Sequence, residues 1–481
     1  MATYKTPGVF VEEISTLPPS IAEVETAIPA FIGYTEKGPV NIPTKITSLL
    51  EYQLNFGSAE PEKSISIAIQ GDTVTVSSDP KKRSKNVLFY AMQLYFSNGG
   101  GPCYVVSTGN FEASANAKNE VYKAALDAVG KEDEPTLIVF PDASFLIPGT
   151  YYNLIIDALN QCVLLGDRFV IIDVVNNANN DMAAAVADFR NIPTTTENAK
   201  YGAAYFPNLI TKIPYSYDEN SIAISGFVDK RAAPASPILT PTPDQPTPDG
   251  AAPAPRPRGG AAASSGSFAN MPNALRNQIK QKITVELGVE LAPSAAVAGV
   301  YASVDNSRGV WKAPANVSRS YVKDPVIKIT DYEQSSLNID VDAGKSVNAI
   351  RAFIGKGTKI WGARTLAGND NEWRYVNVRR FFNMVEESVK KSTYWAVFEA
   401  NDINTWTKVR GMIENYLILK WKDGALAGTK PNEAFFVRVG LGQTMTSQDV
   451  LEGRMYIEIG LAAVRPAEFI ILKFSHLVQT S

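Results

Sequence analysis

The chain has 481 residues, of which 45% are hydrophobic and 20% are charged, so it can form two or three domains that each bury a core. Its 46 basic and 49 acidic residues give a formal net charge of −3 and are spread along the chain. This balance excludes the strong positive field that holds nucleic acid or an anionic membrane. No apolar run approaches the roughly 20 residues that span a bilayer, so we expect no membrane insertion.

Residues that could do chemistry are rare. Cys103, Cys162 and the single histidine, His476, match no zinc-ligand spacing, and His476 lies near the end of the chain without a fixed partner. The sequence therefore predicts no catalytic, metal or cofactor site. Two cysteines and no signal-peptide pattern before Pro7 favour folding in a reducing cytoplasm.

The first 34 residues are predicted to be extended, because prolines at positions 7, 18, 19 and 29 exclude a helix. Strands are expected at Val9–Ile14 and Ala30–Tyr34. An extended arm of about 20 residues could reach about 60 Å, which is more than a local core requires. We expect this arm to reach something other than its own core.

The next 200 residues alternate between helix and strand patterns. Residues 60–80 are polar and turn-rich, and no helix or strand is predicted there. The unbroken apolar strands that follow are typical of a buried, largely parallel sheet with right-handed crossovers. The predicted elements are a helix at Lys85–Phe96, a strand at Cys103–Ser107, a helix at Tyr122–Val129, a strand at Thr136–Phe140, a helix at Tyr152–Cys162 and a strand at Arg168–Val174.

Residues 232–267 differ in kind, with nine prolines among Ala, Gly, Ser and Thr. Such a composition buries too little apolar surface to offset its ordering entropy. It predicts a disordered surface insertion, either a tolerated linker or a docking segment for a partner.

Ordered structure is predicted again from Phe268. Pro293 suits the first turn of a small-residue helix that packs closely. Two amphipathic helices are expected later, one through Val378–Val389 and one through Trp406–Trp421, with Asp402 as a cap of the second and Gly424 and Gly428 after it. The remaining predicted strands are Tyr394–Glu399, Ala434–Gly440, Met455–Val464 and Glu468–Leu477.

Two short motifs resemble chemical sites without matching them. Gly344-Lys345-Ser346 lacks the glycine that a phosphate-binding loop needs at Ile339. The carboxylates Glu386 and Glu387 are interpreted as a solvated or salt-bridging helix face, not as a hydrolase pair.

Four sequence blocks resemble the contractile tail sheath family of phages and phage-tail-like particles. They are TPGVFVEEI with FIGYTEKGP, SNGGGPCYVVS, LAPSAAVAGVYASVDNSRGVWKAPAN, and the stretch from Ile360 to Phe474, which with Lys359 holds five of the six tryptophans. The resemblance implies a mixed α/β, multi-domain, non-enzymatic subunit. Such subunits stack as hexameric rings around an inner tube and contract to drive the tube through a target envelope.

The same resemblance implies that both chain ends are exchanged between subunits as strands. The weakly charged, β-rich FIILKF at the C-terminus supports this independently, because an unpaired strand of that kind is an aggregation hazard. Pairing within the subunit is the alternative. The predicted exchange residues are Val9, Phe10, Val11, Ile14, Phe469, Ile470, Ile471, Leu472 and Phe474.

In the family the C-terminal domain faces the tube. The candidate tube contacts here are Arg379, Arg380, Lys390, Lys391, Lys408 and Lys420. A solvated charge and an intersubunit ion pair are the alternatives for each of them. The implied partners are copies of this chain or paralogous sheath proteins, the tube protein, and baseplate and cap proteins. The implied location is a phage tail or related particle, assembled in the bacterial cytoplasm and then released or anchored.

The resemblance suggests a division into arm and first strand (1–34), inner and connecting segments (35–110 and 268–320), a middle α/β domain (111–231), the insertion (232–267), a tube-facing domain (321–465) and an exchanged strand (466–481). Two other classes stay open: an α/β enzyme with a Rossmann-like core, which the strand and helix alternation favours, and another self-assembling shell protein.

Overall fold

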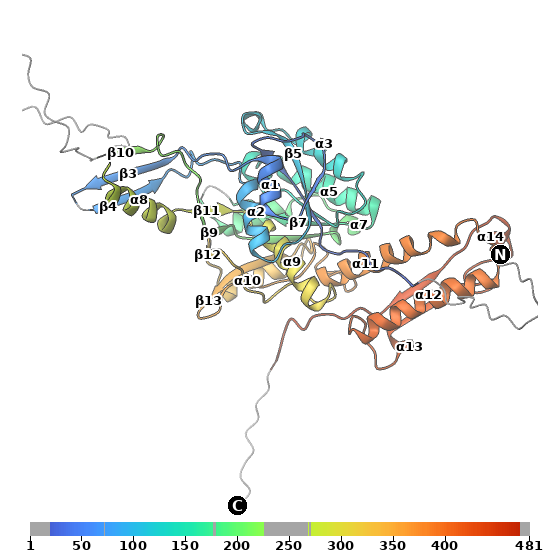
Figure 1. Cartoon of the computed structure of the whole chain (residues 1–481). Helices are drawn as coiled ribbons and strands as arrows, with labels where there is room; N and C mark the ends of the chain where they lie inside the picture. Colours follow the sequence, from blue (N-terminus) through green and yellow to red (C-terminus); the bar gives the residue numbers. More distant parts are fainter. Residues whose placement is uncertain (1–19, 72, 177–178, 226–267, 269–270, 472–481) are drawn as a thin grey trace, which may run out of the picture.

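The computed structural model describes residues 20–71, 73–176, 179–225, 268 and 271–471. Within them the molecule is elongated: a central α/β body carries a small β knob at one end and a helical C-terminal block at the other (Figure 1). The fold is mixed α/β, as the sequence predicts. No described helix is both long enough and apolar enough to cross a membrane.

The body is built on an eight-stranded sheet whose strands are parallel except for the two at its edges. Five adjacent strands, from Gly202–Phe206 to Cys103–Asn110 in the sheet order, are buried at every residue except Asn110, because helices cover both faces, which explains their unbroken apolar runs. The strand order is β14 (Gly357–Ile360), β13 (Val347–Phe353), β8 (Gly202–Phe206), β7 (Phe169–Asp173), β6 (Leu137–Val139), β1 (Pro29–Thr35), β5 (Cys103–Asn110) and β2 (Thr44–Ile46).

Alternate residues of each strand enter two separate cores. Phe31 of β1 packs with α2 (Leu88–Ser97) and α9 (Ser294–Arg308), whereas Ile32 packs with α3 (Asn119–Val129) and α5 (Tyr151–Leu165) on the other face. The other helices of the body are α1 (Leu49–Phe56), α4 (Ala143–Leu146), α6 (Met182–Arg190), α7 (Thr196–Ala199), α10 (Asp331–Asn338) and the short 3-10 helix η1 (Ala113–Asn116).

The helix after Pro293 packs closely, as predicted. At Gly299 of α9 a Cβ atom would lie 2.6 Å from the carbonyl oxygen of Tyr95 in α2. Only glycine permits this approach of two helix backbones.

The β knob holds the largest departure from the sequence prediction. Residues 60–80 are not all loop: β3 (Ile65–Gln70) and β4 (Thr73–Ser78) form a hairpin, joined in parallel by β10 (Ala223–Ser225) and packed on α8 (Asn273–Glu286). Alternating burial along both strands provides the apolar face. The sheet β11 (Gly288–Leu291), β9 (Leu209–Pro214) and β12 (Val322–Pro325) lies between knob and body (Figure 1).

The C-terminal block consists of α11 (Val376–Ser392), α12 (Ile403–Lys422), α13 (Pro431–Ala434), α14 (Ser447–Leu451) and the antiparallel pair β15 (Phe435–Arg438) and β16 (Glu458–Leu461). Both predicted amphipathic helices are confirmed, and Asp402 caps α12 by accepting from the backbone N–H groups of Asn404 and Thr405. The predicted strand at Tyr394–Glu399 is wrong. Its first residues form the 3-10 helix η3 (Tyr394–Ala396), because the loop between the helices is too short to leave the block.

The body sheet crosses the boundaries of the predicted division, because it joins β1, β2 and β5 from residues 1–110 to β6, β7 and β8 from residues 111–231. Residues 347–360, assigned above to the tube-facing domain, form β13 and β14 of the body sheet. The separate C-terminal block begins only with α11. The segment 232–267 lies outside the described residues.

Candidate functional site

The sheet has the geometry of a ligand-binding α/β fold at one place. Strand order reverses between β1 and β6, and ligands of such folds bind outside the carboxyl ends of the strands at this point. Here the chain fills the position itself: Asp142 accepts from the backbone N–H of Tyr34 at 3.0 Å and from the hydroxyl of Tyr122 at 2.8 Å. A side chain at Gly33 would meet the Asp142 carboxylate at 2.6 Å. This packing gives no support to the enzyme alternative.

A second buried carboxylate, Asp173, ends β7. It accepts from the backbone N–H and the hydroxyl of Ser294 at 2.8 and 2.6 Å, and so caps the N-terminus of α9 from the sheet. Burial raises the pKa of Asp142 and of Asp173 to about 7, although the hydrogen bonds that each carboxylate accepts lower it. Both groups therefore have structural roles.

These carboxylates predict how stability depends on pH. Between pH 4 and 7 the folded state holds protons that the unfolded chain, with ordinary aspartate pKa values, has released, so the free energy of unfolding falls as pH rises. Between pH 4 and 7 the free energy of unfolding of the wild type should fall by up to ~4 kcal/mol more than that of an Asp173→Asn variant. Urea unfolding at several pH values measures it, with exposed Asp188→Asn as the control. A wild-type-to-variant difference that is constant with pH would contradict it.

The cysteines and Lys345, considered above as possible chemical groups, are buried or bonded to the backbone. Both cysteine thiols are free and buried, and burial raises their pKa. The ammonium of Lys345 donates to the carbonyl oxygens of Arg190 and Ile192. Within the residues that the structure describes, no group of three or more His, Cys, Asp or Glu is arranged to hold a metal ion, and His476 lies outside them.

Three of the six candidate tube contacts are buried. Arg379 donates to Asn383 and Glu386 and stacks 4.3 Å from the Trp373 ring. Arg380 pairs with buried Asp305 of α9 at 2.5 Å. In the single subunit both guanidinium groups bind residues of their own chain.

Lys420, the third buried candidate, pairs with Glu23 of the N-terminal segment at 2.5 Å and with Asp423 at 3.4 Å. These partners lie within its own subunit.

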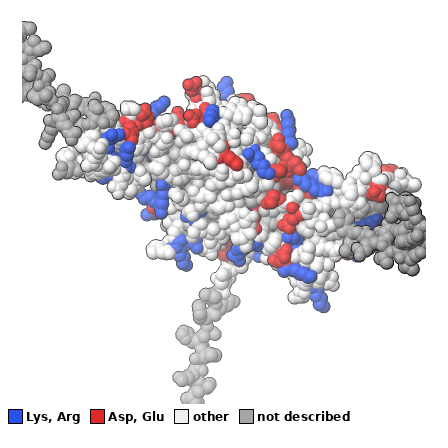
Figure 2. Space-filling model, in the orientation of Figure 1, with Lys and Arg blue, Asp and Glu red and all other residues white. Residues whose placement is uncertain are grey.

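The remaining three candidates are more accessible. Lys391 pairs with Asp133 of the body at 2.6 Å, and Lys390 with Glu387 at 3.2 Å. Lys408 is exposed on α12, and no ion pair joins it to another described residue. Figure 2 shows acidic and basic side chains mixed on the visible face, without an extended field of one sign.

The interpretation of the carboxylate pair on α11 is half correct. Glu386 is partly exposed and pairs with Arg379, but Glu387 is buried between Lys390 and Lys391. Glu387 faces the junction between block and body, where a cavity of about 250 Å³ is also lined by Lys45, Asp133 and Thr26. The network around it joins the two parts of the subunit.

The N-terminal segment begins its described course on the C-terminal block. The backbone N–H groups of Ala22 and Val24 donate to the hydroxyls of Ser392 and Ser388 on α11 at 3.2 and 3.1 Å. The segment then runs into β1 of the body. The predicted exchange residues Val9, Phe10, Val11 and Ile14 lie outside the described residues.

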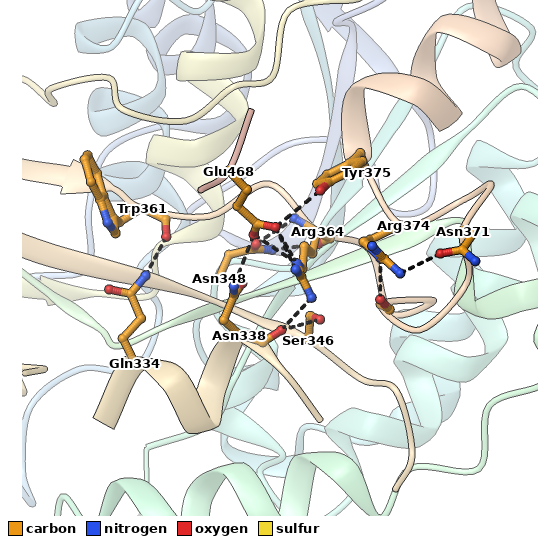
Figure 3. Close-up of polar contacts among 11 residues, drawn as sticks. Gln334, Asn338, Ser346, Asn348, Trp361, Arg364, Asn371, Arg374, Tyr375 and Glu468 are labelled. Atoms are coloured by element: carbon orange, nitrogen blue, oxygen red, sulfur yellow. Dashed lines mark hydrogen bonds and ion pairs between the residues drawn. The ribbon is translucent and has the colours of Figure 1, made fainter. Parts of the chain in front are cut away.

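The C-terminal segment leaves the block after β16 and crosses to the body. Glu468 accepts from Arg364, Asn338 and Tyr375 (Figure 3). Beyond it, Phe469, Ile470 and Ile471 are exposed by 67%, 81% and 80% and form no strand within the subunit. Leu472 and Phe474 lie outside the described residues.

The Glu468 contacts could not be found from the sequence. Arg364 precedes Glu468 by 104 positions, and no local spacing or periodicity links the two residues. Only the fold brings them together.

Known proteins resemble both the C-terminal part and the whole chain. Residues 368–475 match the family model of the phage tail sheath C-terminal domain. Over 124 residues, 26% of the chain, the sequence is 28% identical to the tail sheath protein of Enterobacteria phage T4. That match covers only 18% of the phage protein.

Two solved structures are similar over nearly the full length. The contracted sheath complex of the extracellular contractile injection system PVC is 28% identical, with a TM-score of 0.64 and 99% of both chains covered. The contracted helical sheath of the anti-feeding prophage is 31% identical, with a TM-score of 0.64, 98% of this chain and 99% of that chain covered.

Proposed function

The chain belongs to the contractile tail sheath family, and from this premise we propose that it is a non-enzymatic subunit that stacks as hexameric rings around an inner tube. Contraction of the stack would drive the tube through a target envelope. The observation that supports this most is the full-length likeness to two contracted sheaths of injection systems.

Interface burial can supply the work of contraction. If contraction buries ~1,000 Å² more surface per subunit, the gross gain is roughly 25 kcal/mol, of which a surplus remains after entropy and desolvation. Summed over many rings, a small surplus suffices, and the extended sheath is a kinetically trapped state. No nucleotide is needed for firing.

Strand exchange is the proposed link between subunits. Residues 9–14 and 469–474 would each add a strand to a neighbour, because strand addition satisfies both backbone groups and alternating side chains. The exposed side chains of Phe469–Ile471 support this, since an apolar strand of this kind needs a cover.

The tube contact is proposed for exposed cations of the C-terminal block. Lys408, Lys390 and the partly exposed Lys391 remain candidates, since Arg379, Arg380 and Lys420 are buried in contacts of their own subunit. The other proposed partners are tube, baseplate and cap proteins, in a particle assembled in the bacterial cytoplasm.

Electron microscopy of the purified chain tests the function directly. Hollow helical sleeves are expected. Closed shells would favour the other self-assembling class, and discrete particles that turn over a small ligand would favour an enzyme.

The insertion allows a further test. Deleting residues 232–267 should leave sleeve assembly intact, because the composition of this segment offers little apolar surface to an interface. Sleeve yield and length by electron microscopy measure the effect. Loss of sleeves would show that the insertion is a structural part of the lattice.

A further inference from the structure

The C-terminal segment is anchored to the body at Glu468. Glu468 Oε1 accepts from Arg364 Nε at 2.9 Å and from Asn338 Nδ2 at 3.1 Å, while Oε2 accepts from Arg364 Nη2 at 2.6 Å and from the Tyr375 hydroxyl at 3.3 Å. A carboxylate held by a two-pronged guanidinium contact has little freedom to turn. Figure 3 shows these donors converging on Glu468.

Arg364, which makes two of these contacts, is held by the body sheet. Asn348 of β13 accepts from the backbone N–H of Arg364 and donates to its carbonyl oxygen, both at 2.8 Å. Arg364 is only 5% exposed, and its Nη1 donates to the carbonyl oxygen of Asn338. Contacts with β13 and with the end of α10 therefore help to hold Arg364 in place for Glu468.

Glu468 also separates a part of the chain that is hydrogen-bonded to the subunit from described residues that are not. Before it, the Val464 N–H donates to the Ala425 carbonyl oxygen at 3.2 Å, and Asn377 donates to the Val464 carbonyl oxygen at 3.1 Å. No hydrogen bond holds residues 465–467 or 469–471 among the described contacts. Glu468 is thus the last anchor that the structure describes.

We propose that Glu468 is a positioning residue, which fixes where and in which direction the C-terminal segment leaves its own subunit, with Arg364, Asn338 and Tyr375 as its receptor. This rests on the proposed strand exchange. Without the Glu468 contacts, Val464 is the last residue bonded to the subunit. The four residues after it span about 13 Å when extended, at about 3.3 Å each, so the end of the segment can shift by a comparable distance. That shift exceeds the two-residue repeat of a strand, so the pairing register in the neighbour would no longer be set from this end.

The burial of Arg364 decides which variants are informative. Glu468→Gln keeps the shape and removes the charge, but it leaves the Arg364 guanidinium without its counter-ion. The double variant Arg364→Gln with Glu468→Gln removes both charges and so tests the anchor even if the single variant fails to fold. Glu458→Gln is the matched control, because it removes an exposed, weakly paired carboxylate ten positions away on β16.

The decisive measurement is the distance between spin labels placed by Ile471→Cys and Tyr332→Cys in the full chain, diluted with unlabelled chain. Tyr332 is exposed on the body, and both native cysteines are buried and should not be labelled. We expect at least a twofold broader distance distribution in the Glu468 variants than in wild type or in Glu458→Gln. An unchanged width in the variants would overturn the proposal.

Sleeve formation separates this proposal from strand exchange itself. Deletion of residues 469–481 should abolish sleeves, and the Glu468 variants should reduce sleeve yield about tenfold or disorder the helical lattice. If the deletion leaves normal sleeves, the strand exchange is wrong. If the deletion abolishes them but the Glu468 variants form sleeves of wild-type yield, twist and rise, strand exchange stands and the positioning role of Glu468 is wrong.

Discussion

A chain lacking residues 1–14 is expected to fold normally and to form no sleeves. Residues 20–28, which precede β1, would remain bound to α11 through Ser388 and Ser392, so the subunit should keep its stability. The six residues Val9–Ile14 would add about three backbone hydrogen bonds to a neighbour, at about 1 kcal/mol each. Each contact between neighbouring subunits would lose on the order of 3 kcal/mol of binding free energy, which weakens its affinity about 100-fold. The same loss is repeated at every subunit of the lattice.

Circular dichroism and thermal melting measure folding, and sedimentation with electron microscopy measures assembly. The matched control removes the same number of residues, 245–258, from the insertion and should assemble like wild type. Sleeves of normal yield from the chain lacking residues 1–14 would exclude the N-terminal exchange.

The second large effect is expected at Arg380, which joins three parts of the subunit. Its guanidinium pairs with Asp305 of α9 at 2.5 Å and donates to the carbonyl oxygen of Thr26 at 2.9 Å. The Arg380 and Asp305 side chains are only 3% and 5% exposed. Arg380→Met leaves a buried carboxylate without its counter-ion, which should lower the free energy of unfolding by about 3–5 kcal/mol.

Urea unfolding checks this value. The control is Arg410→Met, which removes an exposed pair with Glu414 on α12 and should cost about 0.5 kcal/mol or less. Equal losses in the two variants would show that the buried pair does not hold block, body and N-terminal segment together.

Several features of the fold could be predicted from sequence because they depend on short-range patterns. The apolar runs of β5, β6 and β7 and the amphipathic spacing of α11 and α12 indicate their own structure. The hairpin of β3 and β4 was missed because its polar, turn-rich composition hides the alternation of buried residues. The strand predicted at Tyr394 was wrong because a short aromatic and β-branched run between two helices has no sheet to join.

The candidate site was predictable only in part. The residues proposed for strand exchange follow from the family resemblance, with support from the apolar FIILKF run, and they stay a prediction. Whether a charge is free to contact a tube depends on distant partners. Arg380 lies 75 positions from Asp305, and no helical periodicity distinguishes it from the exposed Lys408.

Composition and local periodicity, read from the sequence alone, predict a mixed α/β chain with few residues that could do chemistry, and four sequence blocks add the resemblance to the tail sheath family. Three features are visible only in the folded chain: β13 and β14 join the body sheet, Asp142 fills the point where the strand order reverses, and Glu468 pairs with Arg364. The physical reason is that burial and ion pairing depend on contacts between residues far apart in the chain, which no local pattern encodes.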